Sequence, residues 1–197
     1  IQRYEEPGIR ILQALRPDIA LLQEFNYAES PEQLVSRTFG PDAHFVRDST
    51  TLIPNGIVTH FPIVASGEWK NTTSGANRNY AWARIDVPGP RDLLVVSVHL
   101  RTDRVVRRLE MAELAQYMDQ GRGNSIVVLG GDFNGGSSNP ALEAAGTYLN
   151  LFSAPPLNVR GTNATNAGLS KQLDVLLTGR DLEPWEVPIT IGAKTFV

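Results

Sequence analysis

The chain has 197 residues, of which 42% are hydrophobic and 20% charged, so it carries enough apolar material for one sizeable core and fits a single domain over 1–197. Its 18 basic and 21 acidic residues give a formal net charge of −3, which neither excludes nor predicts a nucleic-acid partner. The sequence has no cysteine, which excludes disulfides, thiolate zinc sites and cysteine nucleophiles, and no apolar run reaches the ~18 residues of a membrane span.

The first half of the chain is predicted to combine two helices with short strands. Apolar residues between 9 and 15 share one helical face, and Pro17 ends that helix before a buried strand at 19–22. Pro31 opens a short helix that extends to about residue 39. A polar loop is expected at 71–79, after short strands at 43–47, 56–59 and 63–69.

The second half is predicted to mix hairpins with strand–helix–strand units. Strands at 81–87 and 93–99 form a hairpin, and 105–118 has the periodicity of an amphipathic helix. A short helix begins at Pro140, and further strands are expected at 125–129, 173–177 and near 186–191. This arrangement predicts an α/β fold with functional residues where strands end.

Carboxylates occur at or beside three of the buried apolar runs. Glu24 follows the strand at 19–22, Asp132 follows 125–129, and Asp174 lies within 173–177. A carboxylate on an apolar strand is costly unless it is paired, hydrogen-bonded or metal-bound, so each is a site candidate. Oxygen ligands without cysteine favour Mg²⁺, Mn²⁺ or Ca²⁺ over structural zinc, and Mg²⁺ is the expected ion, with Mn²⁺ possible in its place.

Four segments resemble, in order, those of the endonuclease/exonuclease/phosphatase superfamily of metal-dependent phosphoesterases. They are Asp18-Ile-Ala-Leu-Leu-Gln-Glu24, Val96-Ser-Val-His99-Leu100, Gly130-Gly-Asp132-Phe-Asn134 and Leu173-Asp174-Val-Leu-Leu177. The resemblance spans most of the chain. It implies a four-layer α/β sandwich, in which two mixed sheets pack face to face and are flanked by helices, similar to deoxyribonuclease I.

The resemblance also implies roles for five residues. Glu24 would bind the catalytic metal, and Asp132 would position or deprotonate the water that attacks the phosphorus in line. Asn134, two residues on and on the same side of an extended segment, would donate its amide to the phosphate. His99 would contact the phosphate or act as general acid, and Asp174 resembles the carboxylate that orients a histidine.

Two features of the family pattern do not occur in the sequence. The chain has no Ser-Asp-His segment after Asp174 and no first-strand Asn metal ligand. Because both gaps fall at the ends of the chain, which begins with Ile1, we expect the domain to be truncated at both termini. Arg78 and Arg101 lie near predicted strand ends and are candidate phosphate contacts, since guanidinium matches phosphate in a bidentate geometry.

Each candidate also has a purely structural interpretation. These are turn residues at Asp132 and Asn134, a solvated strand end at Glu24, a hydrogen-bonded sheet histidine at 99, ion pairs from Asp174 to Lys171 or Arg180, and surface solvation of Arg78 and Arg101. The basic run Arg101, Arg104, Arg107 and Arg108 is interpreted as a solvated helix face with ion pairs to Asp103 or Glu110.

The sequence thus predicts a monomeric, Mg²⁺-dependent phosphodiester hydrolase, and more specifically a nuclease, without a membrane span. Its partner would be nucleic acid or another phosphoester; the sequence does not predict a compartment. Alternatives are a phosphatase or phospholipase of the same superfamily, or a non-catalytic binding module on this fold. A two-carboxylate glycosidase built from Glu24 and Asp132 would need no metal.

Overall fold

The computed structural model describes the chain except residues 1, 51, 76, 136–139, 150, 153–157, 159, 186, 188, 192–193 and 197. The first half contains α1 (Gln2–Leu15), β1 (Ile19–Leu22), α2 (Pro31–Phe39), β2 (His44–Arg47), β3 (Gly56–Thr59), β4 (Ile63–Trp69) and β5 (Tyr80–Ile85). The second half contains β6 (Leu93–His99), α3 (Arg104–Gly121), β7 (Ile126–Asp132), α4 (Pro140–Leu149), β8 (Leu151–Phe152), β9 (Asp174–Gly179), the 3₁₀ helix η1 (Arg180–Trp185), β10 (Ile189–Ile191) and β11 (Lys194–Phe196).

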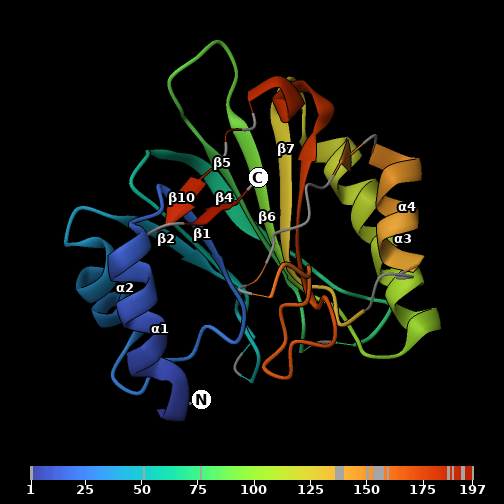
Figure 1. Ribbon diagram of the computed structural model, residues 1–197. Coiled ribbons are helices and arrows are strands. Elements are labelled where there is room, and N and C mark those ends of the chain that lie inside the picture. The colour runs from blue at the N-terminus through green and yellow to red at the C-terminus, as the bar shows by residue number, and fades with distance from the viewer. Residues whose placement is uncertain are drawn as a thin grey trace.

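The elements form a sandwich of two sheets between two helical layers (Figure 1). One sheet has the order β1-β3-β2, the other has the order β4-β5-β6-β7-β9-β8, and β10 and β11 form a separate antiparallel pair. Figure 1 shows α1 and α2 outside the first sheet and α3 and α4 outside the second. The four-layer α/β fold expected from the sequence is confirmed.

Local sequence signals explain where the helices begin. Ser30 accepts a hydrogen bond from the Gln33 backbone N–H at the start of α2, and Pro31 occupies the first turn, where its missing N–H costs nothing. Asp103 caps α3 by accepting from the backbone N–H groups of Val105 and Val106. This cap lies four residues after His99, the last residue of β6, so the link between β6 and α3 is short.

The two faces of β6 belong to different cores. Leu94, Val96 and Val98 pack toward α3 and α4, whereas Val95 packs with Ile57 between the two sheets. This alternation follows from the two-residue period of a strand. β6 is buried on both faces, and with its parallel neighbour β7 it lies in the middle of the six-stranded sheet.

Most predicted strands are confirmed, several with the same limits. The strands at 19–22, 56–59, 63–69 and 93–99 coincide with β1, β3, β4 and β6, and the predicted hairpin is the antiparallel β5–β6 pair. The helix expected at 105–118 extends to Gly121. Part of the last predicted strand lies outside the described residues. No helix in the described part of the chain combines the length and hydrophobicity needed to cross a bilayer.

Candidate active site

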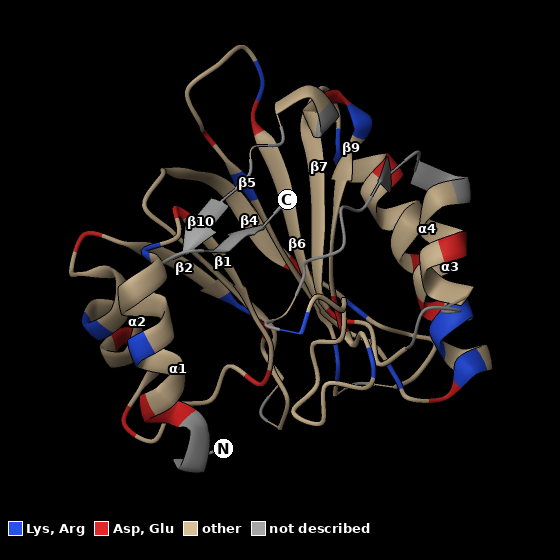
Figure 2. Cartoon of the chain, viewed as in Figure 1, with Lys and Arg blue, Asp and Glu red and all other residues tan. Residues whose placement is uncertain are grey.

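Three candidate residues are brought together by strand register. His99 at the end of β6 is the register partner of Asp132 at the end of β7, and Asp132 is in turn the partner of Asp174 at the start of β9. Charged residues lie in the loops below the sheets in the view of Figure 2. The register of β6, β7 and β9 thus places His99, Asp132 and Asp174, which are far apart in sequence, side by side.

Hydrogen bonds and Gly131 fix the end of β1 against this edge. Gln23 Nε2 donates to Ser97 Oγ at 3.0 Å, and Ser97 Oγ donates to the Leu22 carbonyl at 3.0 Å. A side chain at Gly131 could not fit, because its Cβ would lie 2.0 Å from the Val98 carbonyl oxygen and 2.8 Å from Gln23 Nε2. Gly131 also has φ +139°, which favours glycine. These contacts hold the segment that leads into Glu24.

Asp132 and Asn134 are joined by a tight turn. Asp132 Oδ1 accepts a hydrogen bond from the Asn134 backbone N–H at 2.7 Å, and Asn134 has φ +47°. The expectation that an extended segment would carry both side chains on one side is therefore wrong. A left-handed residue after the strand turns the chain, and Asn accepts this conformation more readily than most residues because its short side chain bonds locally.

The Leu100 carbonyl oxygen links two candidate residues. It accepts from Asn134 Nδ2 at 2.8 Å and from Arg78 Nη1 at 2.7 Å. The bond fixes which end of the Asn134 amide is the nitrogen and uses one of its two N–H donors, so one donor is left for a ligand. Arg78 is half-buried and reaches the ends of β6 and β7 from the loop before β5.

His99 and Asp132 face each other without forming an ion pair. His99 is 6% exposed, and its Nε2 lies 3.5 Å from Asp132 Oδ2. Burial, followed by the positive charges of Arg78 and Arg101, lowers the pKa of His99 to about 4. His99 is thus neutral at pH 7. Its buried Nδ1 has no hydrogen-bond partner among the described residues, which leaves a polar atom for a ligand.

The pKa of the Asp132 carboxyl is shifted in the opposite direction to that of His99. Burial raises its pKa to about 6, the negative charges of Asp174 and Glu24 act in the same direction, and the hydrogen bond from Asn134 and the charge of Arg78 oppose them. These influences mean that Glu24 and Asp174 are each close enough to Asp132 to repel its charged form. A group with a pKa near 6 can exchange a proton in neutral solution.

The donor set fits a hard cation bound with few protein ligands. Glu24 and Asp174 are exposed, and the described ion pairs do not include either carboxylate. Glu24 has φ +51°, a conformation in which non-glycine residues are uncommon outside functional or strained positions. Within the described ranges no three acidic or histidine side chains are close enough to enclose a metal. Exposed carboxylate oxygens such as those of Glu24 are the type of ligand that hard divalent cations prefer.

Two charged residues of α3 were missed as contributors to the site. Arg107 is 7% exposed, and its Nη1 donates to the carbonyls of Arg101 at 3.2 Å and Thr102 at 2.5 Å. Glu110 is fully buried and accepts from the Arg101 backbone N–H at 2.8 Å. The interpretation of Arg107 as part of a solvated face is therefore wrong. Its signal in the sequence was its helical spacing, since Arg107, Glu110 and Met111 share the inward face of α3.

The second candidate arginine, Arg101, is tied to a neighbouring loop. Its Nη2 donates to the Ser74 carbonyl at 2.9 Å and to Asn77 Oδ1 at 3.2 Å. The effects of Arg78 and Arg101 on the pKa of His99 mean that both positive charges are near that ring. The structure thus gathers two arginines and His99 beside the carboxylates.

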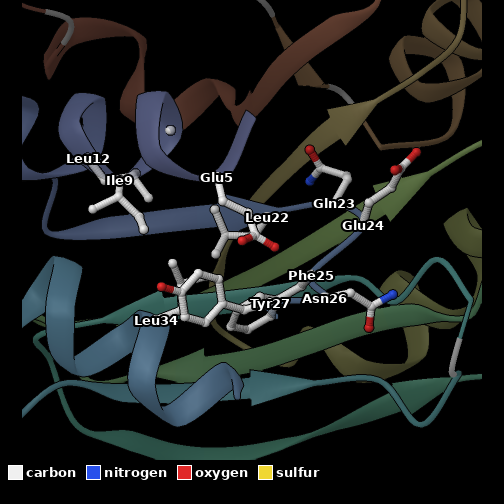
Figure 3. Close-up of a pocket in the computed structure, with 11 residues that line it drawn as sticks. Glu5, Ile9, Leu12, Leu22, Gln23, Glu24, Phe25, Asn26, Tyr27 and Leu34 are labelled. Carbon is white, nitrogen blue, oxygen red and sulfur yellow. The ribbon is translucent and has the colours of Figure 1, made fainter. Parts of the chain in front are cut away.

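A cavity of about 410 Å³ lies between α1 and the segment that follows β1. Ile9, Leu12 and Leu34 contribute apolar walls. Figure 3 shows Glu24 at the edge, with its carboxylate directed away from Ile9 and Leu12. Because these walls offer little to a phosphate, the polar cluster at the ends of β6, β7 and β9 is the better candidate for phosphoester chemistry.

A family model described as the Endonuclease/Exonuclease/phosphatase family matches residues 9–193. Similar solved structures include the human Nocturnin catalytic domain with bound sulfate anion (TM-score 0.70, 17% identity, 89% of this chain and 75% of that chain). A Bacteroides thetaiotaomicron mannosyl-6-phosphatase is also similar (TM-score 0.69, 16% identity, 90% of this chain and 76% of that chain). So is a humanized D. rerio TDP2 (TM-score 0.71, 17% identity, 96% of this chain and 83% of that chain). At these identities the likenesses show the fold alone. No curated protein sequence matches the chain significantly.

Proposed function

The chain belongs to the endonuclease/exonuclease/phosphatase family, and we propose that it is a Mg²⁺-dependent phosphodiester hydrolase that acts as a nuclease. Members of this family are hydrolytic phosphoesterases and are generally metal-dependent. The observation that carries the proposal is the Asp132 carboxylate, which the charges of Asp174 and Glu24 repel, beside two arginines and a neutral histidine. A divalent cation would reduce the repulsion among the carboxylates, and a phosphate would accept hydrogen bonds from the two arginine guanidinium groups.

Asp132 is the proposed base for the attacking water. With a pKa of about 6 it is mostly ionised at pH 7.5 and still basic enough to accept a proton from water at the carboxylate oxygens. The Asn134 N–H holds Oδ1 in place, and His99 Nε2 lies 3.5 Å from Oδ2. The second N–H of the Asn134 amide would donate to the phosphate as its charge grows.

Glu24 is the residue that would hold Mg²⁺. When bound, the ion supplies Lewis-acid stabilisation of negative charge on the phosphate oxygens. Arg78 and Arg101 would bind phosphate oxygens through guanidinium donors not used for the Leu100, Ser74 and Asn77 contacts. Asp174 lies beside Asp132 in register, where its charge favours retention of the Asp132 proton.

Nicking of supercoiled plasmid tests the nuclease proposal. The wild-type protein with Mg²⁺ should convert supercoiled to open-circular DNA, and excess EDTA should stop the reaction. Asp132→Ala should lower the rate by about 10²-fold or more while the circular dichroism spectrum is retained. Asp119→Ala is the matched control, because Asp119 is an exposed residue of α3 that pairs with Arg122. Equal nicking by Asp132→Ala would contradict the assignment of Asp132.

A second candidate is hydrolysis of phosphomonoesters. It is favoured by the similarity to a structure named as a mannosyl-6-phosphatase. Parallel assays with bis-p-nitrophenyl phosphate and p-nitrophenyl phosphate distinguish the two reactions. Preference for the monoester, together with no nicking, would replace the nuclease with a phosphatase. No hydrolysis of any of these substrates by folded protein with Mg²⁺ would favour a binding module on this fold.

A further inference from the structure

Glu110 is a buried carboxylate on α3, outside the cluster of proposed catalytic residues. It is fully buried, and it forms no ion pair with any of the residues that the structure describes. Its Oε2 accepts from the Arg101 backbone N–H at 2.8 Å, and its Oε1 accepts from Asn71 Nδ2 at 2.8 Å. Burial of a carboxylate is costly even when it is hydrogen-bonded, and a neutral side chain would avoid the cost. A role that needs the charge would explain its presence.

Both hydrogen bonds of Glu110 lead to segments that carry the arginines of the site. Arg101 is bound directly through its backbone N–H. Asn71 begins the loop 71–79 that contains Arg78, and Asn71 Oδ1 accepts from the Ser74 N–H at 3.0 Å. The Ser74 carbonyl accepts from Arg101 Nη2 at 2.9 Å, which closes a ring of hydrogen bonds through Glu110. One buried side chain therefore connects the two segments.

The charge of Glu110 also balances the arginines. Burial and the neighbouring charge of Arg101 lower the pKa of Arg78, whereas Glu110 raises it, followed by Asp132 and Glu24. Two guanidinium groups held near each other repel, and a buried anion nearby offsets that repulsion. Glu110 contributes this negative charge from the interior, where substrate does not reach it.

We propose that Glu110 is a positioning residue that sets the separation of Arg78 and Arg101, so that their guanidinium groups receive one phosphate beside His99 and Asp132. The inference rests on the proposed function, because it concerns how the same site binds a phosphoester. Glu110 acts through the Arg101 backbone and Asn71 and does not touch the reacting atoms. Its removal should therefore weaken phosphate binding more than it slows the chemical step.

Glu110→Gln tests this role with little change in volume. Glutamine can accept from only one of the two donors, and it removes the buried charge. Glu113→Gln is the matched control. Glu113 lies one turn further along α3 and accepts from the Thr72 N–H at 3.0 Å, so it holds the same loop without bonding to Arg101. Both variants are compared with wild type in Mg²⁺, using bis-p-nitrophenyl phosphate as substrate and inorganic phosphate as inhibitor.

For Glu110→Gln we expect KM and the inhibition constant of phosphate to rise about tenfold, with kcat within about threefold of wild type. Glu113→Gln should change neither constant by more than about twofold. Should Glu110→Gln fail to fold, Asn71→Ser removes one of the two hydrogen bonds and should shift both constants in the same direction. Where both variants fold, the double variant should lose less affinity than the product of the two single effects, because both act through one network.

Two results would overturn the inference while wild type remains active: unchanged phosphate inhibition in folded Glu110→Gln, or an equal loss in Glu113→Gln. If wild type hydrolyses no phosphoester, the proposed function fails, and the positioning role is tested by titration with inorganic phosphate alone. The ¹⁵N–¹H signals of the Arg78 and Arg101 Nε groups should then shift in wild type and shift less in Glu110→Gln. Equal shifts, or no shift in wild type, would contradict the role of Glu110.

Discussion

His99 and Asp132 are register partners across the parallel β6–β7 pair, with 3.5 Å between His99 Nε2 and Asp132 Oδ2, yet the fold disfavours the charged form of each. Burial lowers the pKa of His99 to about 4 and raises that of Asp132 to about 6. Between these pH values both groups are mainly neutral, and above pH 6 only Asp132 is charged. The pair is thus not a stabilising ion pair at neutral pH, because His99 is then uncharged.

The raised pKa of Asp132 has a consequence for stability. Because the folded protein holds this proton more tightly than the unfolded chain, the contribution of Asp132 to stability is full below about pH 4 and is lost as the pH rises through about 6. We expect Asp132→Asn to be more stable than wild type by about 3 kcal/mol at pH 7.5 in EDTA. Urea unfolding at pH 7.5 and at pH 4 measures the difference, which should vanish at the lower pH. A gain of similar size at both pH values would point to a cause other than titration.

Arg78 influences both members of the pair. Its charge lowers the pKa of His99 and of Asp132, so Arg78→Met should raise both. The histidine ring signals and the Asp132 carboxyl carbon, followed by NMR between pH 3 and 8, would report the two pKa values. Arg122→Met is the control, since Arg122 pairs with Asp119 at the far end of α3. Opposite shifts of the two groups would argue against Arg78 as their common neighbour.

The effect of Mg²⁺ on thermal stability should show whether Glu24, and not another carboxylate, binds the ion. If Glu24 holds Mg²⁺, saturating Mg²⁺ should raise the melting temperature of wild type, because a ligand that binds only the folded state stabilises it. At a Mg²⁺ concentration about 100 times the dissociation constant the gain is about 2.7 kcal/mol. Glu24→Gln should abolish this increase, whereas Glu29→Gln, an exposed glutamate nearby, should retain it. An undiminished increase in Glu24→Gln would assign the ion to other ligands.

Gly131 should tolerate no side chain. Its φ of +139° is unfavourable for alanine, and an added Cβ would lie 2.0 Å from the Val98 carbonyl oxygen. We expect Gly131→Ala to destabilise the protein by at least ~2 kcal/mol. The comparison is Gly146→Ala in α4, where nothing lies within 4 Å and a gain of up to ~1 kcal/mol is expected. Thermal unfolding of the two variants should therefore move in opposite directions.

Much of the fold could be predicted because local patterns and tertiary packing agree. The apolar runs of β1, β3 and β6 are strands in which burial reinforces propensity, and Pro31 and Asp103 mark helix starts by simple capping chemistry. The apolar runs also drew attention to the carboxylates at or beside them, Glu24, Asp132 and Asp174. The turn at Asn134 was only an alternative in the sequence, because a left-handed residue depends on the hydrogen bonds its neighbours offer, including the one from its N–H to Asp132.

The sequence by itself determined the order of the elements, the family and the identity of the acidic and basic candidates, because these depend on residue type and spacing along the chain. Only the tertiary structure decided that His99 is neutral, that Leu100 joins Arg78 to Asn134, and that Glu110 is buried. Burial, charge proximity and hydrogen-bond partnership are set by segments far apart in sequence, such as loop 71–79, α3 and the end of β7. No local pattern records those distances.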